Sequence, residues 1–271
     1  MREILLPKKN IKDSFTQETI DQWQRIGHHF YTDIPSFGGI WNTVVEACGL
    51  RADHHPVARL VKYLRSFIDT GQQALYSMGR LQLFSTQEAS NTFEFYVAHY
   101  LYDFLARVKT ATDLLALMIN HIFELGLSEK VCSLEKGAFS NALRNKDPSD
   151  QQMKKLGSKL DKARNDWLSA FYELRNLIIH RAGLRFIAMG VSDAGQSRIH
   201  IATGDLLRIA DERKLLEELL TRIGAGSVSP YGTIDPLRLC EELWMELTGL
   251  VEDVINKCQP QIVAFVSSKT S

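Results

Sequence analysis

The feature that most constrains the fold is the run from Ala89 to Leu125, which contains no glycine and no proline. The pattern predicts a helix of roughly 35 residues, far longer than the average helix of a globular protein. A helix of that length is typically the spine of an up-and-down helical bundle. The apolar side chains recur at three- or four-residue steps with one longer step, the spacing of one helix face: Phe93, Val97, Leu101, Phe104, Val108, Leu115, Met118 and Ile122.

A second long helix is predicted to begin at Asp150, because Asp147-Pro148-Ser149-Asp150 is a strong helix start. From there to His180 the only glycine or proline is Gly157, and one face is apolar. We expect Asp33–Gly39 to be a loop and Pro260 to end the last helix, since proline interrupts helical hydrogen bonding. Shorter helices are expected at 16–31, 40–48, 57–82, 133–143, 211–223 and 235–258.

Composition changes after Gly183, where two short apolar runs flank the turn-forming Ser192–Gln196. These runs predict a small β-hairpin over 184–203. Because so few strands cannot build a sheet-based core, the predicted fold class is all-α: an up-and-down helical bundle with two long spine helices and a small β-hairpin. The predicted division of the chain is an N-terminal arm with short helices (1–53), the bundle with its hairpin (54–260) and a C-terminal tail (261–271).

The composition is that of an ordinary soluble globular protein, with 45% hydrophobic and 24% charged residues. The chain carries 32 lysines and arginines against 32 acidic residues, so it has no global positive field that would attract nucleic acid. A nucleic-acid partner would therefore need a local basic patch, for example one formed by an oligomer.

The cysteines and the hydropathy pattern bear on the compartment. Cys48, Cys132, Cys240 and Cys258 form no CxxC pair and have apolar neighbours, which predicts buried thiols in a reducing environment. The N-terminus has no apolar run long enough for a signal peptide, and the most apolar window, Leu114–Leu125, is too short to cross a bilayer. We expect a cytoplasmic protein with no membrane partner.

Most common catalytic motifs are absent from the sequence. The adjacent pairs His28-His29 and His54-His55 point about 100° apart on a helix, so neither pair chelates one ion by itself. The sequence contains no HExxH, GxxxxGK[ST], GxGxxG or GxSxG motif. We therefore expect no metal and no cofactor.

The stretch Phe171–Gly183 carries the most suggestive set of polar residues. Tyr172, Asn176 and His180 are spaced four apart and share a helix face. Arg175 lies five residues before His180, about 140° round a regular helix. The pair can meet if the helix is distorted before Gly183, or if two chains bring their copies together across a two-fold axis.

This set suits RNA cleavage by the RNA's own 2′-hydroxyl group. A histidine near its ordinary pKa can remove that proton or protonate the leaving 5′-oxygen. An arginine can hold the phosphate and its transition-state charge, without a metal. One histidine serves poorly as base and acid at once, so a dimer that supplies two copies makes chemical sense.

Arg175-Asn176-Leu-Ile-Ile-His180, near the end of a late bundle helix, resembles the Arg-x4–6-His motif of HEPN domains. These are α-helical, dimeric domains of prokaryotic toxin, antiphage-defence and RNA-processing proteins, and their catalytic members are metal-independent endoribonucleases. The resemblance covers about residues 55–182. It implies a homodimer in which Arg175 and His180 are catalytic and Asn176 positions the RNA or the histidine. Tyr172 and Arg181 would bind substrate, and an antitoxin or defence-system partner would be expected.

Three alternatives stay open. The chain can be a non-catalytic HEPN-like module that binds nucleotide, RNA or a protein partner. Arg175 and Asn176 can instead cap or pair within the bundle while His180 satisfies the helix C-terminus. On the first long helix, His99, Asp103 and Arg107 follow at i, i+4 and i+8, and this ladder is either a solvated face or a support for the site.

Overall fold

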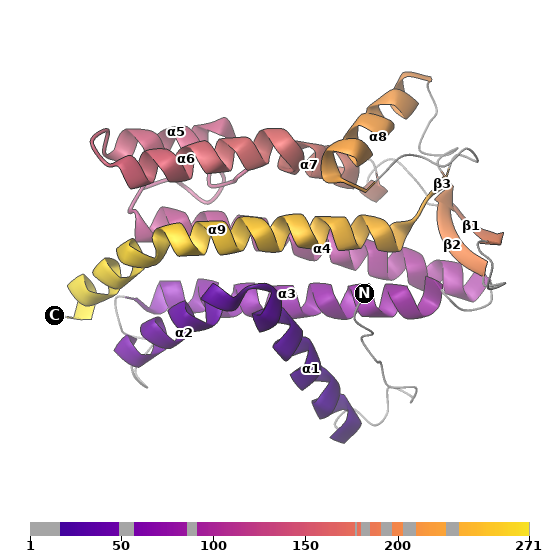
Figure 1. The fold of residues 1–271 in the computed structure, drawn as a ribbon, viewed down its shortest axis with the longest axis horizontal. Helices are drawn as coiled ribbons and strands as arrows, with labels where there is room; N and C mark the ends of the chain where they lie inside the picture. Colours follow the sequence, from indigo (N-terminus) through magenta and orange to yellow (C-terminus); the bar gives the residue numbers. More distant parts are fainter. Residues whose placement is uncertain are drawn as a thin grey trace. The chain divides into compact units, whose positions relative to one another are not determined.

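The computed structural model describes residues 17–48, 57–85, 91–176, 178–179, 185–190, 197–202, 210–225 and 233–270. This part of the chain is predominantly helical, as the sequence predicts (Figure 1). The helices are α1 (Gln17–Asp33), α2 (Pro35–Cys48), α3 (Ala58–Ser85), α4 (Asn91–Ile122), α5 (Gly137–Lys146), α6 (Gln151–Ala163), α7 (Ser169–Asn176), α8 (Ala210–Ile223) and α9 (Pro236–Thr270). The strands are β1 (Arg185–Gly190), β2 (Ser197–Ala202) and β3 (Thr233–Ile234).

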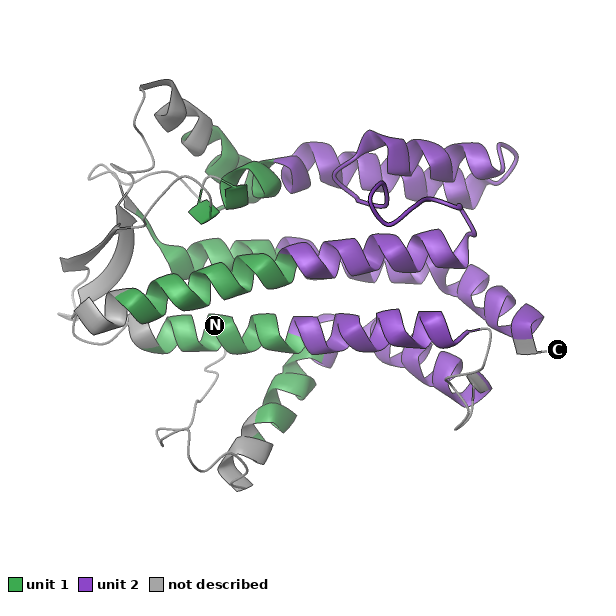
Figure 2. Cartoon of the chain, turned by 180° about the vertical axis from the view of Figure 1, so that it is seen from behind, with its two compact units in different colours: residues 1–30, 72–108, 170–245 green, residues 31–71, 109–169, 246–271 purple. Residues whose placement is uncertain are grey.

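The chain divides into two compact units, which Figure 2 shows in two colours. Unit 1 comprises residues 1–30, 72–108 and 170–245, and unit 2 comprises residues 31–71, 109–169 and 246–271. Helices α1, α3, α4, α7 and α9 contribute residues to both units. The division into 1–53, 54–260 and 261–271 stays a prediction, as does the up-and-down order of the helices.

The first long helix, α4, carries the apolar face that its sequence predicts. Every apolar residue predicted for this face whose side chain the structure describes is buried: Val97, Leu101, Phe104, Val108, Leu115, Met118 and Ile122. The side chain of Phe93 lies outside the described residues. Burial of a continuous stripe stabilises a helix far more than intrinsic propensity does.

A three-stranded antiparallel sheet in the order β1-β2-β3 lies in unit 1. Strands β1 and β2 pair with Phe186 opposite Ile201, inside the range predicted for the hairpin. Strand β3 adds Ile234 opposite Ile201 and directly precedes α9. The sheet is a small addition to a helical protein, so the class remains all-α.

Helix α2 begins earlier than the sequence predicts, so the expectation of a loop over Asp33–Gly39 is wrong. Pro35 occupies the first helical position, where its missing N–H costs nothing. The carboxylate of Glu252, from α9, accepts hydrogen bonds from the backbone N–H of Ser36 at 3.1 Å and from its Oγ at 2.6 Å. A carboxylate at a helix N-terminus satisfies unpaired donors and favours the helix dipole.

Helix α9 does not end at Pro260, which corrects a second prediction. The helix continues to Thr270, and Pro260 lies inside it on the exposed side. Beyond the proline, Ile262, Phe265 and Val266 are buried. Their burial offsets the hydrogen bond that proline cannot donate, and solvent can reach the carbonyl group left free.

The predicted helix from Asp150 to His180 is helical throughout Gln151–Asn176, with a change of helix type inside it, and His180 lies outside the described residues. Asp150 caps α6 by accepting hydrogen bonds from the backbone N–H groups of Gln152 and Met153 at 2.7 and 3.2 Å. A π-helical turn, Arg164–Leu168, then separates α6 from α7. Such turns insert a residue into the helix and occur often at functional sites.

Two smaller predictions can be compared with the structure. Cys132, Cys240 and Cys258 are buried free thiols, as the sequence predicts, while the side chain of Cys48 lies outside the described residues. Within the described ranges, no helix is both long enough and apolar enough to cross a membrane.

Candidate functional site

Helix α7, which carries Arg175 and Asn176 of the candidate motif, is positioned by the burial of its apolar face. Phe171, Leu174 and Ile178 are fully buried in unit 1. The helix ends at Asn176, and Ile178 and Ile179 have π-helical rather than α-helical hydrogen bonding. The apolar face therefore determines which residues of the motif reach the surface.

Arg175 lies half-buried at this helix end. Its Nη1 donates a hydrogen bond to Oδ1 of Asn176 at 3.1 Å, and Asn176 is exposed. Its Nε is buried and has no hydrogen-bond partner among the described residues. The ion pairs found in the described part of the chain do not include Arg175. Its guanidinium thus retains a positive charge and unused donors.

Two arginines of unit 2, unlike Arg175, form ion pairs with a carboxylate. Arg144 and Arg164 both pair with the carboxylate of Asp161, the second at 2.9 Å. A partly buried cation is normally compensated in this way. Arg175 lacks such a carboxylate within the described ranges, which argues against the reading that it only pairs inside the bundle.

Tyr172 is placed differently from the sequence prediction. It is only 3% exposed, and its ring packs edge-on against Phe171 at 5.5 Å. A side chain this buried contributes to the core of unit 1 rather than to an RNA-binding surface. Its predicted contact with substrate therefore has no support in the structure. His180 and Arg181 lie outside the described residues.

The predicted ladder on α4 is only partly formed. Asp103 accepts a hydrogen bond from Oγ of Ser77 in α3 at 2.6 Å and pairs with Arg107 at 3.1 Å. His99 is exposed, and its ring lies 5.1 Å from that of Tyr100. No hydrogen bond within the described ranges joins His99 to Asp103. The contacts tie α3 to α4, and a supporting role for His99 and Asp103 at the site stays a prediction.

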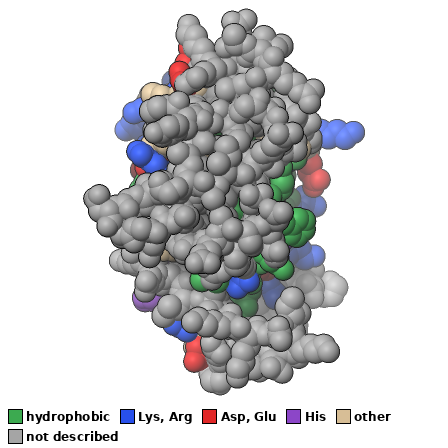
Figure 3. All heavy atoms as spheres, turned by 90° about the vertical axis from the view of Figure 1, so that its right-hand side faces the viewer, with side chains coloured by type: hydrophobic (Ala, Val, Ile, Leu, Met, Phe, Trp, Pro, Cys, Tyr) green, Lys and Arg blue, Asp and Glu red, His purple; other side chains and the backbone are tan. Residues whose placement is uncertain are grey.

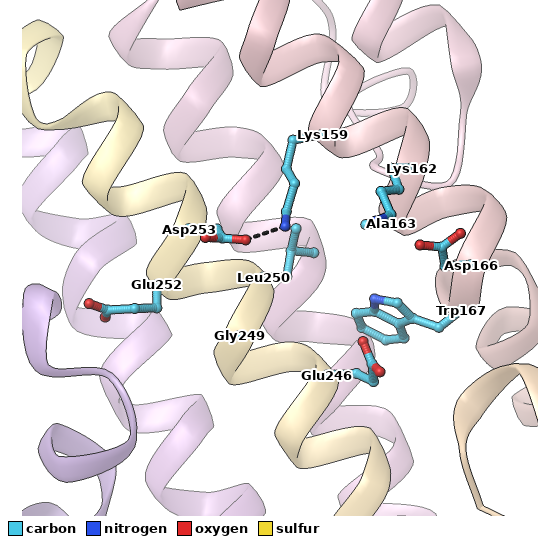
Figure 4. Close-up of a pocket in the computed structure, with 10 residues that line it drawn as sticks. All are labelled: Lys159, Lys162, Ala163, Asp166, Trp167, Glu246, Gly249, Leu250, Glu252 and Asp253. Atoms are coloured by element: carbon cyan, nitrogen blue, oxygen red, sulfur yellow. Dashed lines mark ion pairs between the residues drawn. The ribbon is translucent and has the colours of Figure 1, made fainter.

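The structure also contains cavities that the sequence pattern did not indicate. One, of about 490 Å³, lies in unit 2 between α9 and the segment formed by α6 and the π-helical turn (Figure 4). Lys159 and Asp253 form an ion pair across it, while Trp167 and Gly249 line its apolar part. Long-range packing creates this cavity, so a search for local motifs cannot find it.

Comparison with protein families finds one match that covers much of the chain. A model of the HEPN_Cthe2314-like HEPN family matches residues 58–220, more than half of the chain. The matched range includes α3, α4 and the whole segment from α5 to α7. No curated protein and no solved structure matches the chain.

Proposed function

Because the chain belongs to the HEPN_Cthe2314-like HEPN family, we propose that it acts on RNA as a metal-independent endoribonuclease and works as a homodimer. The family match supports a function related to RNA or nucleotides. The catalytic residues proposed are Arg175 and His180, with Asn176 as the residue that orients the arginine.

The observation that carries this proposal is the state of Arg175. A buried donor without a partner costs about 1–3 kcal/mol, more for a charged group, so a protein rarely keeps one without a use. A phosphate group offers both the negative charge and the acceptor oxygens that this guanidinium lacks. The exposed neighbour Asn176 holds the side chain by one hydrogen bond and leaves its charge intact.

The proposed reaction is an attack of the ribose 2′-oxygen on the adjacent phosphorus. The bond from phosphorus to the 5′-oxygen breaks, which gives a 2′,3′-cyclic phosphate and a 5′-hydroxyl end. His180 of one chain takes the proton of the 2′-hydroxyl, and the same histidine of the second chain protonates the 5′-oxygen. Arg175 stabilises the additional negative charge on the phosphate oxygens.

A homodimer agrees with the surface of unit 1. Figure 3 shows some hydrophobic side chains, with lysine and arginine side chains nearby, among the described residues of one face. Phe95 and Met245 of unit 1 are 69% and 56% exposed. A contiguous exposed apolar patch, rather than a single exposed side chain, is typical of a surface that binds another protein. Sedimentation of wild type and of Phe95→Asp tests whether this surface holds a second copy.

The decisive experiment is cleavage of single-stranded RNA in the presence of a chelator of divalent ions. Wild type should cleave, and Arg175→Ala or His180→Ala should lower the rate about 100-fold or more, the usual effect of removing such a group. Glu173→Ala is the matched control, because Glu173 is exposed on the same helix. Cleavage that needs a divalent ion, or that survives both substitutions, contradicts the proposal.

The zero net charge favours a second candidate, a non-catalytic module that binds nucleotide, RNA or a protein partner. Such a module binds its ligand equally well with and without His180. A toxin or antiphage-defence role belongs to the first candidate: expression of the wild type should arrest growth, and His180→Ala should relieve the arrest.

A further inference from the structure

A second cavity of unit 2, of about 330 Å³, lies at the C-terminal end of α4. Its polar lining comes from Arg59 and Tyr63 of α3 and from Asn120, His121 and Glu124 at the end of α4. The volume is at the small end of ligand-binding cavities. None of these residues belongs to the motif Arg175–His180, so the cavity shares no residue with the proposed ribonuclease site.

The wall of this cavity has an unusual backbone. Glu124 has a φ of 47°, a left-handed conformation that is uncommon outside glycine, and Gly126 follows with a φ of 71°. The side chain of Asn120 holds the turn through hydrogen bonds to the N–H and C=O groups of Leu127 at 3.1 and 3.0 Å. The backbone N–H groups of Glu124 and Leu125 donate to the carbonyl groups of His121 and Asn120 at 3.3 and 3.0 Å, the hydrogen-bond pattern of a helix C-cap, which fixes this wall of the cavity.

Two lysines keep Glu124 in place. Lys146 donates from Nζ to the backbone carbonyl of Glu124 at 2.8 Å, and Lys269 of α9 lies 3.2 Å from the carboxylate Oε1. The side chain of Glu124 is still 62% exposed. The carboxylate of Glu124 is therefore held at the cavity and can still accept further hydrogen bonds.

His121 supplies an aromatic wall and an unused polar atom. Its ring lies edge-on to Tyr63 at 6.2 Å and to Phe265 at 5.1 Å, and its Nε2 is buried without a hydrogen-bond partner in the described part of the chain. Burial, followed by the charges of Arg59 and Lys269, lowers the pKa of His121 despite the opposing charge of Glu124. The imidazole is therefore neutral at pH 7.

The chemistry of the lining restricts the ligand. A small anion is disfavoured by Glu124, and a small cation is disfavoured by Arg59 and Lys269. A flat molecule with hydrogen-bond acceptors beside donors can pair with the positive Arg59 and with the negative Glu124. Aromatic side chains commonly stack on the face of such a molecule. Guanine has this pattern, because O6 and N7 accept from arginine while its N1–H and N2–H groups donate to a carboxylate.

We propose that this cavity binds a guanine base, with Arg59 donating to O6 and N7, Glu124 accepting from N1 and N2, and the Tyr63 ring against the base. The base can come from a free guanine nucleotide or from an unpaired guanine of an RNA. The site recognises the base itself, so an adenine, which lacks O6 and the N1–H donor, is rejected.

The experiment measures binding of GMP and AMP by calorimetry and follows the imidazole signals of His121 by NMR. GMP should shift these signals and bind at least about tenfold more tightly than AMP. Arg59→Ala and Glu124→Gln should each weaken GMP binding at least about tenfold. Arg65→Ala is the matched control, because Arg65 is exposed on the same helix but does not line the cavity.

Three features of the experiment make the result unambiguous. Glu124→Gln changes an exposed side chain without changing its size, so it tests the site even if another variant folds poorly. His180→Ala should bind GMP like wild type, so failure of the ribonuclease proposal leaves this result unaffected. A short single-stranded RNA with one guanine, compared with the same RNA carrying adenine, distinguishes a base within RNA from a free nucleotide. Equal binding of GMP and AMP, or unchanged GMP binding by both cavity variants, overturns the proposal.

Discussion

Nη1 of Arg175 lies 3.1 Å from Oδ1 of Asn176, its neighbour in the sequence, while Nε of the same guanidinium is buried without a partner within the described ranges. The amide oxygen orients the arginine but does not neutralise it. A carboxylate at this position would do both, and the arginine would then resemble the paired Arg144 and Arg164 of unit 2. Asparagine at position 176 therefore leaves the positive charge of Arg175 able to bind an anion.

This relationship predicts the effect of Asn176→Asp. The substitution keeps the size of the side chain but gives Arg175 an internal anion, so RNA affinity should fall at least about tenfold, or about 1.4 kcal/mol. Asn176→Ala should cost less, because it removes orientation and leaves the charge. Fluorescence anisotropy in the His180→Ala background separates binding from cleavage. If Asn176→Asp binds RNA as tightly as the parent, Arg175 does not contact phosphate.

The contact between α2 and α9 gives a prediction about stability. Glu252 of α9 accepts two hydrogen bonds from Ser36 of α2. Removing a helix cap of this kind costs about 1–2 kcal/mol, so Glu252→Ala and Ser36→Ala should each destabilise the protein by that order. Their double variant should lose little more than either single one, as urea unfolding would show. Fully additive losses would mean that the two residues do not act together.

Local patterns predicted the features that depend on local physics. The period of apolar residues located α4 to within a few residues of Asn91–Ile122. The helix start at Asp150 could be predicted because a side-chain acceptor before a helix accepts hydrogen bonds from backbone N–H groups only two and three residues away. The motif Arg175–His180 stays a prediction, because His180 lies outside the described residues.

The errors share a different cause, which is long-range contact. The cap of α2 comes from a residue 216 positions away in the sequence. The extension of α9 beyond Pro260 depends on burial of Phe265 and Val266, which no local pattern reveals. The burial of Tyr172 also could not be predicted from local spacing. Its spacing in the sequence indicates the same helix face as Asn176, whereas in the structure its side chain is packed in the core.

Asp161 should make stability depend on pH. Burial raises its pKa, but hydrogen bonds from Ser140 and Arg144 and the charges of Arg144 and Arg164 outweigh burial and hold the pKa below its ordinary value. The folded state then binds fewer protons than the unfolded state, so this stability is present above the unfolded pKa of about 3.9 and is lost as pH falls through the folded pKa. Asp161→Asn should cost about 2 kcal/mol at pH 7.

The pH profile is the check on this assignment. The difference in unfolding free energy between wild type and Asp161→Asn should stay constant from about pH 7 to pH 5 and shrink below about pH 4. A difference that is unchanged at low pH would show that Asp161 acts through packing alone.

Pro260 offers the clearest test of the fold, because the sequence and the structure disagree there. In a continuous α9, Pro260→Ala restores a backbone donor for the carbonyl group of Asn256 and removes a clash, worth up to about 3 kcal/mol. The loss of proline's restriction on the unfolded chain reduces this gain by about 1 kcal/mol. The variant should therefore be more stable by about 2 kcal/mol in urea unfolding. Gln259→Ala, at the exposed neighbouring position, should change stability little. Equal stability of Pro260→Ala and Gln259→Ala would mean that the helix ends at Pro260. The burial of Phe265 beyond the proline would then also be wrong.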